Sequence, residues 1–170
     1  MIKIFIAMRL LAAATTLDTA LAKVPNSAKL SSATRFQYAL FFEMAGEETR
    51  IDPFLLAAVA WHESDLENLA PNASNDIGLM QVHWQPMQTP GETWLLGLTK
   101  TELKDPYKNI LAGARELAHD REFCRRLHHS GAAHDWWSHY RFGVVVPSNR
   151  YGRAIQGLIN RLRYRPRHTS

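Results

Sequence analysis

The sequence predicts an all-α protein with a single, mostly helical domain. Apolar residues recur at helical spacing in four long segments, and no segment shows sustained strand-like alternation. The chain has 170 residues, 46% hydrophobic and 21% charged, which is typical of one globular domain. Its one cysteine, Cys124, excludes an internal disulfide framework and a cysteine-based zinc site.

The first 22 residues resemble an export signal. Lys3 precedes an apolar stretch, which closes with the small-x-small cleavage pattern A-L-A at residues 20–22. Arg9 interrupts the stretch, and an amphipathic first helix is the alternative interpretation. We expect a signal peptide over residues 1–22, an exported periplasmic protein, and a Ser- and Ala-rich linker over residues 23–33.

Apolar spacing and end signals place four helices after the linker. The first ends at Gly46, and the second begins at Asp52-Pro53, where Asp caps the helix and Pro takes its first position. Asp105-Pro106 repeats this start signal. The expected helices cover residues 34–46, 53–70, 106–130 and 150–165, with a shorter candidate at 132–142. They form one domain over residues 34–165, and a basic tail follows at 166–170.

Charge is distributed unevenly along the chain. The formal net charge is +4, but residues 136–170 hold seven arginines and no acidic residue, and therefore carry +7. Residues 1–135 carry −3, from thirteen basic and sixteen acidic residues. The basic part suits an anionic partner, although a solvated helix face has the same composition. The arginines do not follow a helix-turn-helix pattern, so no nucleic acid partner is expected.

Glu63 is the leading candidate for acid–base chemistry. Its neighbours one and two turns earlier on the second expected helix, Ala60, Val59 and Leu56, are all apolar. A carboxyl group on such a face loses solvation in its charged form, and burial therefore favours the protonated form that a general acid needs. The alternative is a glutamate that stays solvated at the helix edge or pairs with His62.

The residues after Glu63 carry a family resemblance. Ser64 follows it, then an Asn-rich loop, and then the motif G-L-M-Q-V at residues 78–82. The downstream motifs are N-I-x-x-G, Y-R-F-G and R-Y-x-x-x-I, beginning at residues 109, 140 and 150. In this order the motifs resemble the soluble lytic transglycosylase (SLT-type) family, whose domain is goose-lysozyme-like. The resemblance covers residues 52–162.

The sequence departs from that family at several positions. Asn72 and Asn75 stand where the family has Ser and Gly, and Arg141 replaces the Asn that follows the tyrosine. Asn tolerates the left-handed backbone conformation better than other residues with a side chain, so we expect the turn at Asn75 to be kept. The change at Arg141 affects the expected floor of the sugar-binding groove.

The resemblance implies a peptidoglycan lytic transglycosylase, which cleaves the MurNAc–GlcNAc bond without water and leaves 1,6-anhydromuramyl ends. In that family one glutamate acts as acid and then as base, and the substrate's N-acetyl group replaces the second carboxylate that most glycosidases use. By resemblance, Glu63 takes the role of this glutamate.

The resemblance also implies which residues meet the substrate. Met80 and Gln81 line the groove near the scissile bond. Tyr140 and Tyr151 orient the glutamate or the N-acetyl group through their hydroxyls. Ser64 holds either the glycan or the chain, since a hydroxyl at a helix end often bonds to backbone.

Two alternatives to this function stay open. One is a lysozyme-type hydrolase of the same bond, and the other is a catalytically weak glycan-binding accessory protein. Asp76 is the best-placed second carboxylate for hydrolysis, because it lies in the loop opposite Glu63. A turn residue that caps the Gly78 segment is the simpler interpretation of Asp76.

No cofactor and no metal are expected. His62-Glu63 begins like the zinc motif H-E-x-x-H, but Leu66 stands at the fifth position. Four further histidines cluster at residues 128, 129, 134 and 139. Scattered solvent-facing histidines near a helix end are more common than a metal site.

The remaining expectations concern Cys124, Trp84 and the partners. Cys124 has no evident base partner in the sequence and is expected to be a buried structural thiol. Trp84 follows the G-L-M-Q-V motif and has the best claim on the groove among the tryptophans. The resemblance implies peptidoglycan glycan strands as substrate and a secretion, conjugation or pilus complex of the cell envelope as partner. The Arg-rich carboxyl-terminal part suits an anionic membrane.

Overall fold

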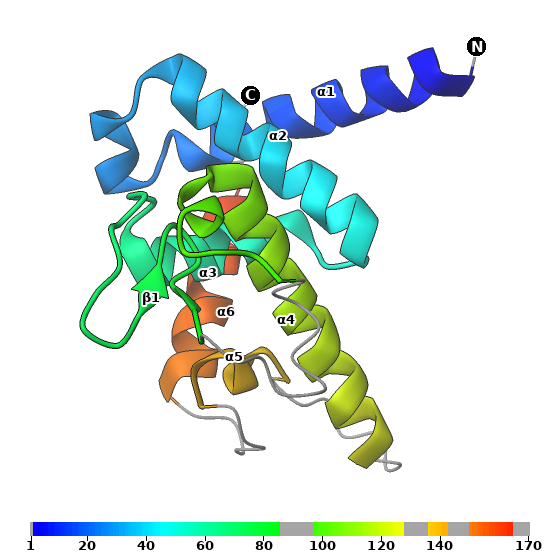
Figure 1. Cartoon of the computed structure of the whole chain (residues 1–170). Coiled ribbons are helices and arrows are strands. Elements are labelled where there is room, and N and C mark those ends of the chain that lie inside the picture. The colour runs from blue at the N-terminus through cyan, green and yellow to red at the C-terminus, as the bar shows by residue number, and fades with distance from the viewer. Residues whose placement is uncertain (1, 86–96, 128–135, 143–149, 165–170) are drawn as a thin grey trace.

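The computed structural model describes residues 2–85, 97–127, 136–142 and 150–164, and these residues are mostly helical (Figure 1). The α-helices in these ranges are α1 (Ile2–Leu21), α2 (Ser32–Thr49), α3 (Pro53–Ser64), α4 (Pro106–Leu127), α5 (His139–Phe142) and α6 (Arg150–Arg163). The remaining elements are the 3-10 helices η1 (Pro25–Lys29), η2 (Glu102–Lys104) and η3 (Trp136–Ser138) and a hairpin of β1 (Asp76–Ile77) and β2 (Val82–His83). The predicted all-α fold class is confirmed, with this small hairpin as its strand content.

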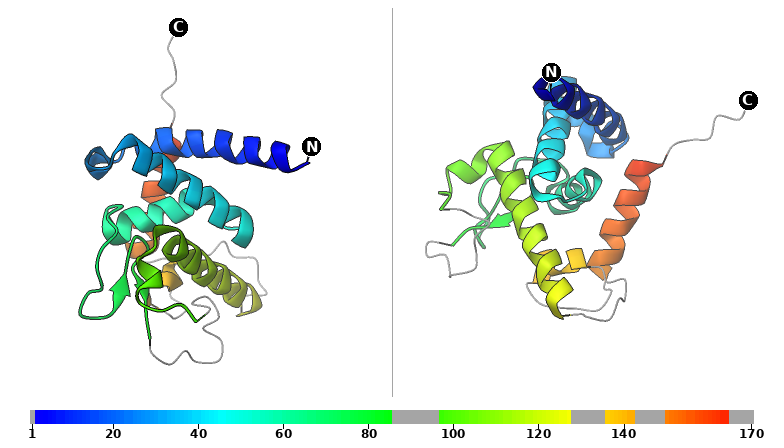
Figure 2. Two further views of the ribbon diagram at one scale, coloured as in Figure 1. Left: turned by 45° about the horizontal axis from the view of Figure 1, so that its top comes forward. Right: turned by 90° about the vertical axis from the view of Figure 1, so that its right-hand side faces the viewer.

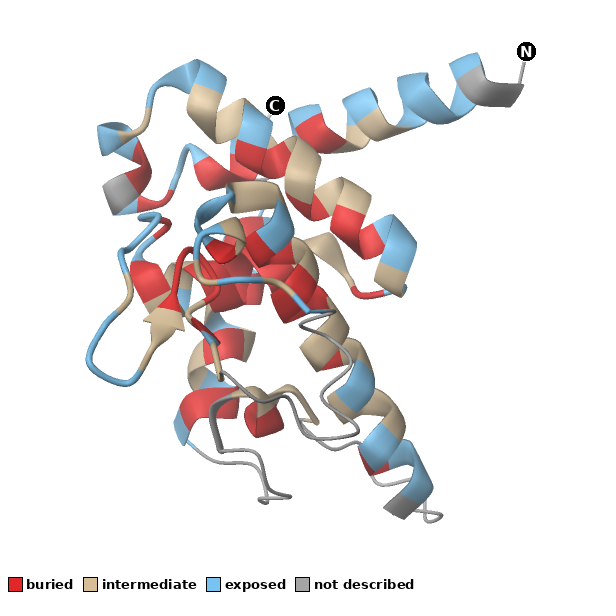
Figure 3. Ribbon diagram, in the orientation of Figure 1, coloured by how far each residue is buried: buried red, intermediate tan, exposed pale blue. Residues whose placement is uncertain are grey.

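Helix α3 is the centre of the core. Its residues from Leu55 to Ala60 are all buried, and it contacts α1, α2, α4 and α6 (Figure 3). A helix that is apolar around its whole circumference must be covered on every side, and the surrounding helices do this. Its start is as expected, because the Asp52 carboxylate accepts a hydrogen bond from the Phe54 N–H at 3.1 Å and Pro53 is the first residue.

The predicted helix end at Gly46 is wrong. Helix α2 continues to Thr49, and Arg50 ends it in the left-handed conformation with φ 58°. A Cβ at Gly46 would lie 2.7 Å from the Ile51 carbonyl oxygen and 2.8 Å from Pro53 Cγ. The glycine therefore serves the close return of the chain against α2 and does not end the helix.

The predicted length of the second helix is also wrong. Helix α3 ends at Ser64, before Pro71 is reached, because Asp65 and Leu66 both adopt positive φ, 54° and 64°. Leu66 is fully buried as a result, so the reversal returns an apolar side chain to the core. The burial of Leu66 offsets the cost of left-handed backbone at two residues that have side chains.

The other expected elements are found with shifted ends. The linker at 23–33 contains η1, and Ser31 caps α2 by accepting a hydrogen bond from the Thr34 N–H at 3.0 Å. Helices α4 and α6 cover most of the two later predictions. Of the candidate at 132–142, only residues 136–142 lie within the described ranges, where η3 precedes α5.

Asn109 joins α4 to the segment that follows α3. Its side-chain amide is fully buried and donates to the carbonyl oxygens of Ile77 and Leu103, at 2.8 and 3.1 Å. Its carbonyl oxygen accepts from the Met80 N–H at 2.8 Å. One side chain thus binds three backbone groups in the protein interior.

Gly78 has to be glycine beside Asn109. Its φ is +73°, and a Cβ there would lie 2.5 Å from the Asn109 amide nitrogen. Gly113, one turn after Asn109 on α4, has a similar purpose, since a Cβ there would lie 2.9 Å from the Met80 side chain and from the Tyr140 hydroxyl. Both glycines let the G-L-M-Q turn lie directly against α4.

The later part of α4 holds a buried ionisable cluster. Burial raises the pKa of the Asp120 carboxyl to about 7, and its Oδ2 atom has no hydrogen-bond partner among the described residues. Cys124 is buried, as expected, but His139 Nε2 lies 3.1 Å from its Sγ atom, which the sequence did not indicate. Burial and the charge of Asp120 raise the pKa of the Cys124 thiol.

The Asn109 contacts predict a large loss of stability in Asn109→Ala. The variant removes three hydrogen bonds to backbone groups in the interior, so we expect the free energy of unfolding to fall by about 3 kcal/mol. Asn68→Ala is the matched control, because Asn68 donates one hydrogen bond, to the Lys104 carbonyl, from an exposed position. Urea unfolding measures both variants, and an Asn109→Ala loss no larger than that of Asn68→Ala would contradict the assignment.

Asp120 predicts a decrease in stability as the pH rises. The folded state holds the Asp120 proton up to about pH 7, whereas the unfolded state releases it near the ordinary value of 3.8. Stability is therefore lost between these two pH values and stays low above them. Asp120→Asn should raise the free energy of unfolding by about 3 kcal/mol at pH 8 and by little near pH 4.

Urea unfolding at the two pH values measures this difference. Glu122→Gln is the control, because Glu122 is an exposed carboxylate of the same helix that pairs with Arg125 and Arg126. The control should give no stabilisation at pH 8. An Asp120→Asn effect that is equal at both pH values would show that the proton of Asp120 is not its cause.

Candidate active site

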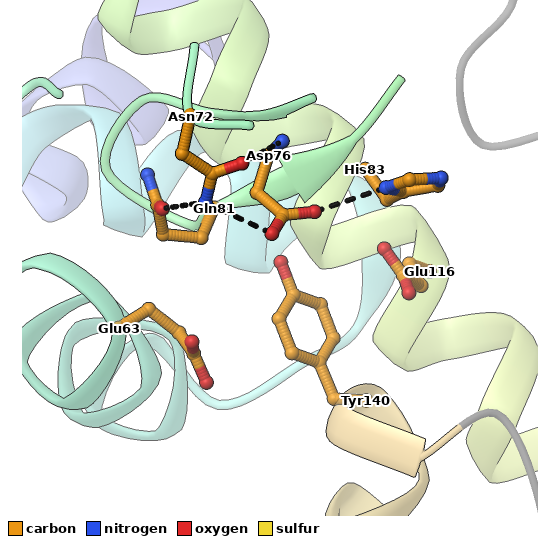
Figure 4. A pocket seen from close by; sticks show the side chains of 7 residues that line it. All are labelled: Glu63, Asn72, Asp76, Gln81, His83, Glu116 and Tyr140. Carbon is orange, nitrogen blue, oxygen red and sulfur yellow. Dashed lines mark hydrogen bonds and ion pairs between the residues drawn. The ribbon is translucent and has the colours of Figure 1, made fainter. Parts of the chain in front are cut away.

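A polar cleft of 490 Å³ lies between the end of α3 on one side and the hairpin and α4 on the other. The lining residues are Glu63, Asn72, Asp76, Gln81, His83, Glu116 and Tyr140. Glu63 lies on one side, at the end of α3, and the hairpin and α4 form the other, with Tyr140 reaching in from α5 (Figure 4). Segments that are distant in sequence thus meet at one cavity.

Glu63 is held at the edge of the core. Its side chain is only 8% exposed, since it lies one turn after the buried part of α3. The Tyr151 hydroxyl donates to Glu63 Oε1 at 2.8 Å, and His62 Nδ1 lies 3.6 Å from the same oxygen. The rings of Tyr151 and His62 pack edge to face with centroids 4.8 Å apart. Helix α6 therefore restrains the carboxyl group that α3 presents to the cleft.

Gln81 faces the cleft from the turn that Asn109 holds. Its φ is 48°, and its Nε2 atom donates to the Gly78 carbonyl at 2.8 Å. Its side-chain carbonyl lies 3.4 Å from the amide nitrogen of Asn72, which donates to it. These contacts place a primary amide, which both donates and accepts hydrogen bonds, beside the space in front of Glu63.

Met80 is fully buried and does not line the cleft. Its carbonyl oxygen accepts a hydrogen bond from the Tyr140 hydroxyl at 2.7 Å. Burial raises the pKa of Tyr140 well above its ordinary value, and the charges of Glu116 and Glu63 add to this effect. Tyr140 therefore stays protonated and acts as a fixed hydrogen-bond donor between two carboxyl groups.

Ser64 points away from the cleft. Its hydroxyl is buried within hydrogen-bond distance of two carbonyl oxygens, Ala60 at 2.9 Å and Leu79 at 2.7 Å. The second contact joins the end of α3 to the G-L-M-Q turn. Of the two roles expected for Ser64, this geometry favours holding the chain.

The hairpin presents Asp76 and His83 together. They are cross-strand partners, so their side chains share one face, while Ile77 and Val82 are buried on the other. The Asp76 carboxylate contacts His83 Nδ1 at 3.0 Å with one oxygen and accepts from the Asn72 amide at 3.0 Å with the other. Asp76 is 28% exposed, so it is much wetter than Glu63.

Two asparagines shape the loop before the hairpin. The side-chain carbonyl of Asn72 accepts from the N–H groups of Ser74 and Asp76, at 2.8 and 3.0 Å. Asn75 adopts φ 64°, so the prediction that this turn tolerates asparagine is confirmed. The Lys100 ammonium group donates to the side-chain oxygen Oδ1 of Asn75 and lies over the Trp84 ring, 4.7 Å from its centroid. Trp84 is not among the residues that line the cleft.

Glu116 is a cleft residue that the sequence reasoning missed. It is half-buried on α4 and lines the cleft with Asp76, across from Glu63. The signal that marks it is its spacing, since it follows Asn109 by seven residues and Gly113 by three, which places all three on one helix face.

The cleft suits acid–base work on a neutral, polar ligand. The Glu63 carboxyl group is nearly dry and hydrogen-bonded to a tyrosine, whereas Asp76 is wetter, and Asp76 and Glu116 lie opposite it. Within the described residues, no three His, Cys, Asp or Glu side chains lie close enough to hold a metal ion; His128, His129 and His134 fall outside those residues.

Comparison with known proteins identifies the family of the chain. Residues 41–136 match the family model described as the transglycosylase SLT domain, which is more than half of the chain and includes Glu63, Gln81 and Glu116. The matched family has a lysozyme-like fold. Comparison with curated proteins and with solved structures gives no match. The chain belongs to the transglycosylase SLT domain family.

Proposed function

We propose that the protein is a peptidoglycan lytic transglycosylase that uses Glu63 as its single acid–base group. Family membership supports this type of function in general. The observation that supports the specific assignment is the 8% exposed Glu63 carboxyl, bound by Tyr151 and facing a polar cleft. The substrate is the glycan strand of peptidoglycan, cleaved at the MurNAc–GlcNAc bond.

The reaction has two proton transfers at one carboxyl group. Glu63 protonates the glycosidic oxygen as the bond to the muramyl anomeric carbon breaks, and the substrate's N-acetyl oxygen stabilises the positive centre. The 6-hydroxyl of the same sugar then attacks that carbon and gives its proton to Glu63. The glutamate is restored, no water is consumed, and the product has a 1,6-anhydro ring.

The other cleft groups bind and orient. Gln81 offers its amide to sugar hydroxyl or N-acetyl groups, and Tyr151 fixes the direction of the Glu63 carboxyl. Tyr140 and Met80 act together, because the tyrosine hydroxyl donates a hydrogen bond to the Met80 carbonyl and so fixes the backbone beside the cleft. Ser64 acts indirectly, through the Leu79 carbonyl that it binds.

Hydrolysis of the same bond is the second candidate. It is supported by the position of Asp76, which lines the cleft with both carboxylate oxygens held, by His83 and Asn72. An inverting hydrolase needs such a second carboxylate to activate water. Because Asp76 is partly solvated and already paired, we favour the transglycosylase. A catalytically weak glycan-binding accessory protein is the third candidate function.

The site also implies where the protein acts. Proteins of this family act on peptidoglycan, which implies export. We propose that residues 1–22 direct the chain to the periplasm, where a secretion or conjugation complex uses it to open the wall locally. The Arg-rich carboxyl-terminal part would strengthen contact with anionic lipid.

Glu63→Gln tests the proposed acid–base group. The amide keeps the shape and cannot transfer the proton, so release of muropeptides from purified peptidoglycan should fall about a thousandfold. Glu67→Gln is the matched control, because Glu67 is an exposed glutamate that pairs with Lys29. The control should keep wild-type activity, and undiminished cleavage by Glu63→Gln would refute the assignment.

Tyr151→Phe tests the orientation of Glu63. Loss of one hydrogen bond to the carboxyl group should lower kcat by about tenfold to a hundredfold and change KM little. Tyr38→Phe is the control, since Tyr38 is a buried tyrosine on α2 that does not line the cleft. Steady-state muropeptide release gives both constants. An equal loss in both variants, or a change in KM alone, would contradict the orienting role.

A further inference from the structure

Helix α1 consists of two halves with different surroundings. The inner half lies along α2, and its apolar residues are fully or almost fully buried; these are Ala14, Leu17, Ala20 and Leu21. The outer half projects beyond the body of the protein (Figures 1 and 2). Its large apolar side chains are exposed, from 46% at Ile6 to 73% at Phe5, and include Ile4, Met8 and Leu11.

The charges of α1 are paired with α2. Asp18 accepts two hydrogen bonds from the Arg35 guanidinium, at 2.7 and 3.5 Å, in a half-buried ion pair. Arg9 forms an ion pair with Glu47 at 2.5 Å. Arg9 is the residue that makes the segment an irregular export signal, and Asp18 is a second charge within it. Both have a partner in the folded protein, which is the pattern of a structural helix.

The expected cleavage point after residue 22 lies in folded chain. The Lys23 N–H bonds to the Ala20 carbonyl at 3.1 Å, and the Val24 N–H bonds to the Leu21 carbonyl at 2.9 Å. The Lys23 side chain also donates to the Tyr164 carbonyl, which joins this turn to the end of α6. Ala22 and Lys23 are exposed, but the turn is hydrogen-bonded and joined to the end of α6, so it is folded chain and not a free linker.

A lipid surface is the occupant that suits the outer half. Ile4, Phe5 and Ile6 are consecutive, so they point about 100° apart around the helix axis, and apolar side chains face several directions between Lys3 and Arg9, which is paired with Glu47. A protein groove covers one face of a helix, whereas lipid surrounds it. The stretch Ile4–Leu21 has mean hydropathy 1.5 and is long enough to span a bilayer. Because the inner half is docked, the free residues reach only about 12 Å, enough to enter one leaflet.

We propose that α1 stays on the exported enzyme and inserts its outer half into a lipid surface. The inner half fixes the enzyme to this attachment through Leu17, Leu21 and the Asp18–Arg35 pair. The proposal rests on the export proposed above and is independent of the reaction. Loss of lipid binding and loss of glycan cleavage can therefore be told apart.

The first experiment measures the mass of the chain recovered from the envelope of cells that export it. We expect the intact chain with residues 2–22 still present. A chain that begins at Lys23 would overturn the proposal, because α1 would then be a removed leader.

The second experiment is flotation of the purified full chain with zwitterionic phosphatidylcholine vesicles at low and high salt. Binding should persist at both, because apolar insertion and not charge holds the helix. Phe5→Glu should weaken binding about tenfold or more. Phe123→Glu is the matched control: Phe123 is also exposed, on the end of α4 farthest from α1.

The outcomes of the flotation experiment are distinct. Loss of binding in Phe5→Glu with binding retained by Phe123→Glu, and cleavage activity unchanged in both variants, would support insertion through α1, whereas unchanged binding by Phe5→Glu would overturn it. Binding that disappears at high salt would show that basic residues carry it and would overturn the proposal. Equal losses of vesicle binding in Phe5→Glu and Phe123→Glu would also overturn the proposal.

Discussion

The buried amide of Asn109 is the interaction on which the cleft depends. It holds the backbone on both sides of Gly78, at Ile77 before the G-L-M-Q turn and at Met80 within it, and it also binds Leu103 before α4. The turn needs Gly78 because no side chain fits beside that amide. With the turn fixed, Met80 offers its carbonyl to Tyr140 and Gln81 faces Glu63. A structural hydrogen bond thereby sets the geometry of the chemical site.

The proposed chemistry rests on a difference in hydration between the carboxyl groups of the cleft. Glu63 is 8% exposed and bound by Tyr151, whereas Asp76 is more than three times as exposed and is paired on both oxygens. Tyr140 lies between carboxyl groups that raise its pKa, so it remains a donor and does not act as a base. These environments support the proposal that Glu63 is the single proton carrier of the reaction.

Local signals in the sequence predicted the parts of this arrangement that local physics determines. The Asp52-Pro53 start, the apolar turns before Glu63 and the tolerance of Asn75 for a left-handed turn were all readable. The prediction of a helix end at Gly46 was wrong because this glycine is needed for a close tertiary contact with Ile51 and Pro53. Glu116 was missed for the same reason, since its place in the cleft depends on how α4 crosses the hairpin. The reversal at Leu66 depends on burial that spacing alone does not show.

The central claim is that a single carboxyl group cleaves the glycan without water. Digestion of peptidoglycan in heavy-oxygen water, followed by mass spectrometry of the new muramyl ends, tests it most directly. The account predicts anhydro ends that contain no heavy oxygen, because the sugar's own hydroxyl closes the ring. Reducing ends with one heavy oxygen per cleaved bond would contradict it and would assign Asp76 or Glu116 the activation of water.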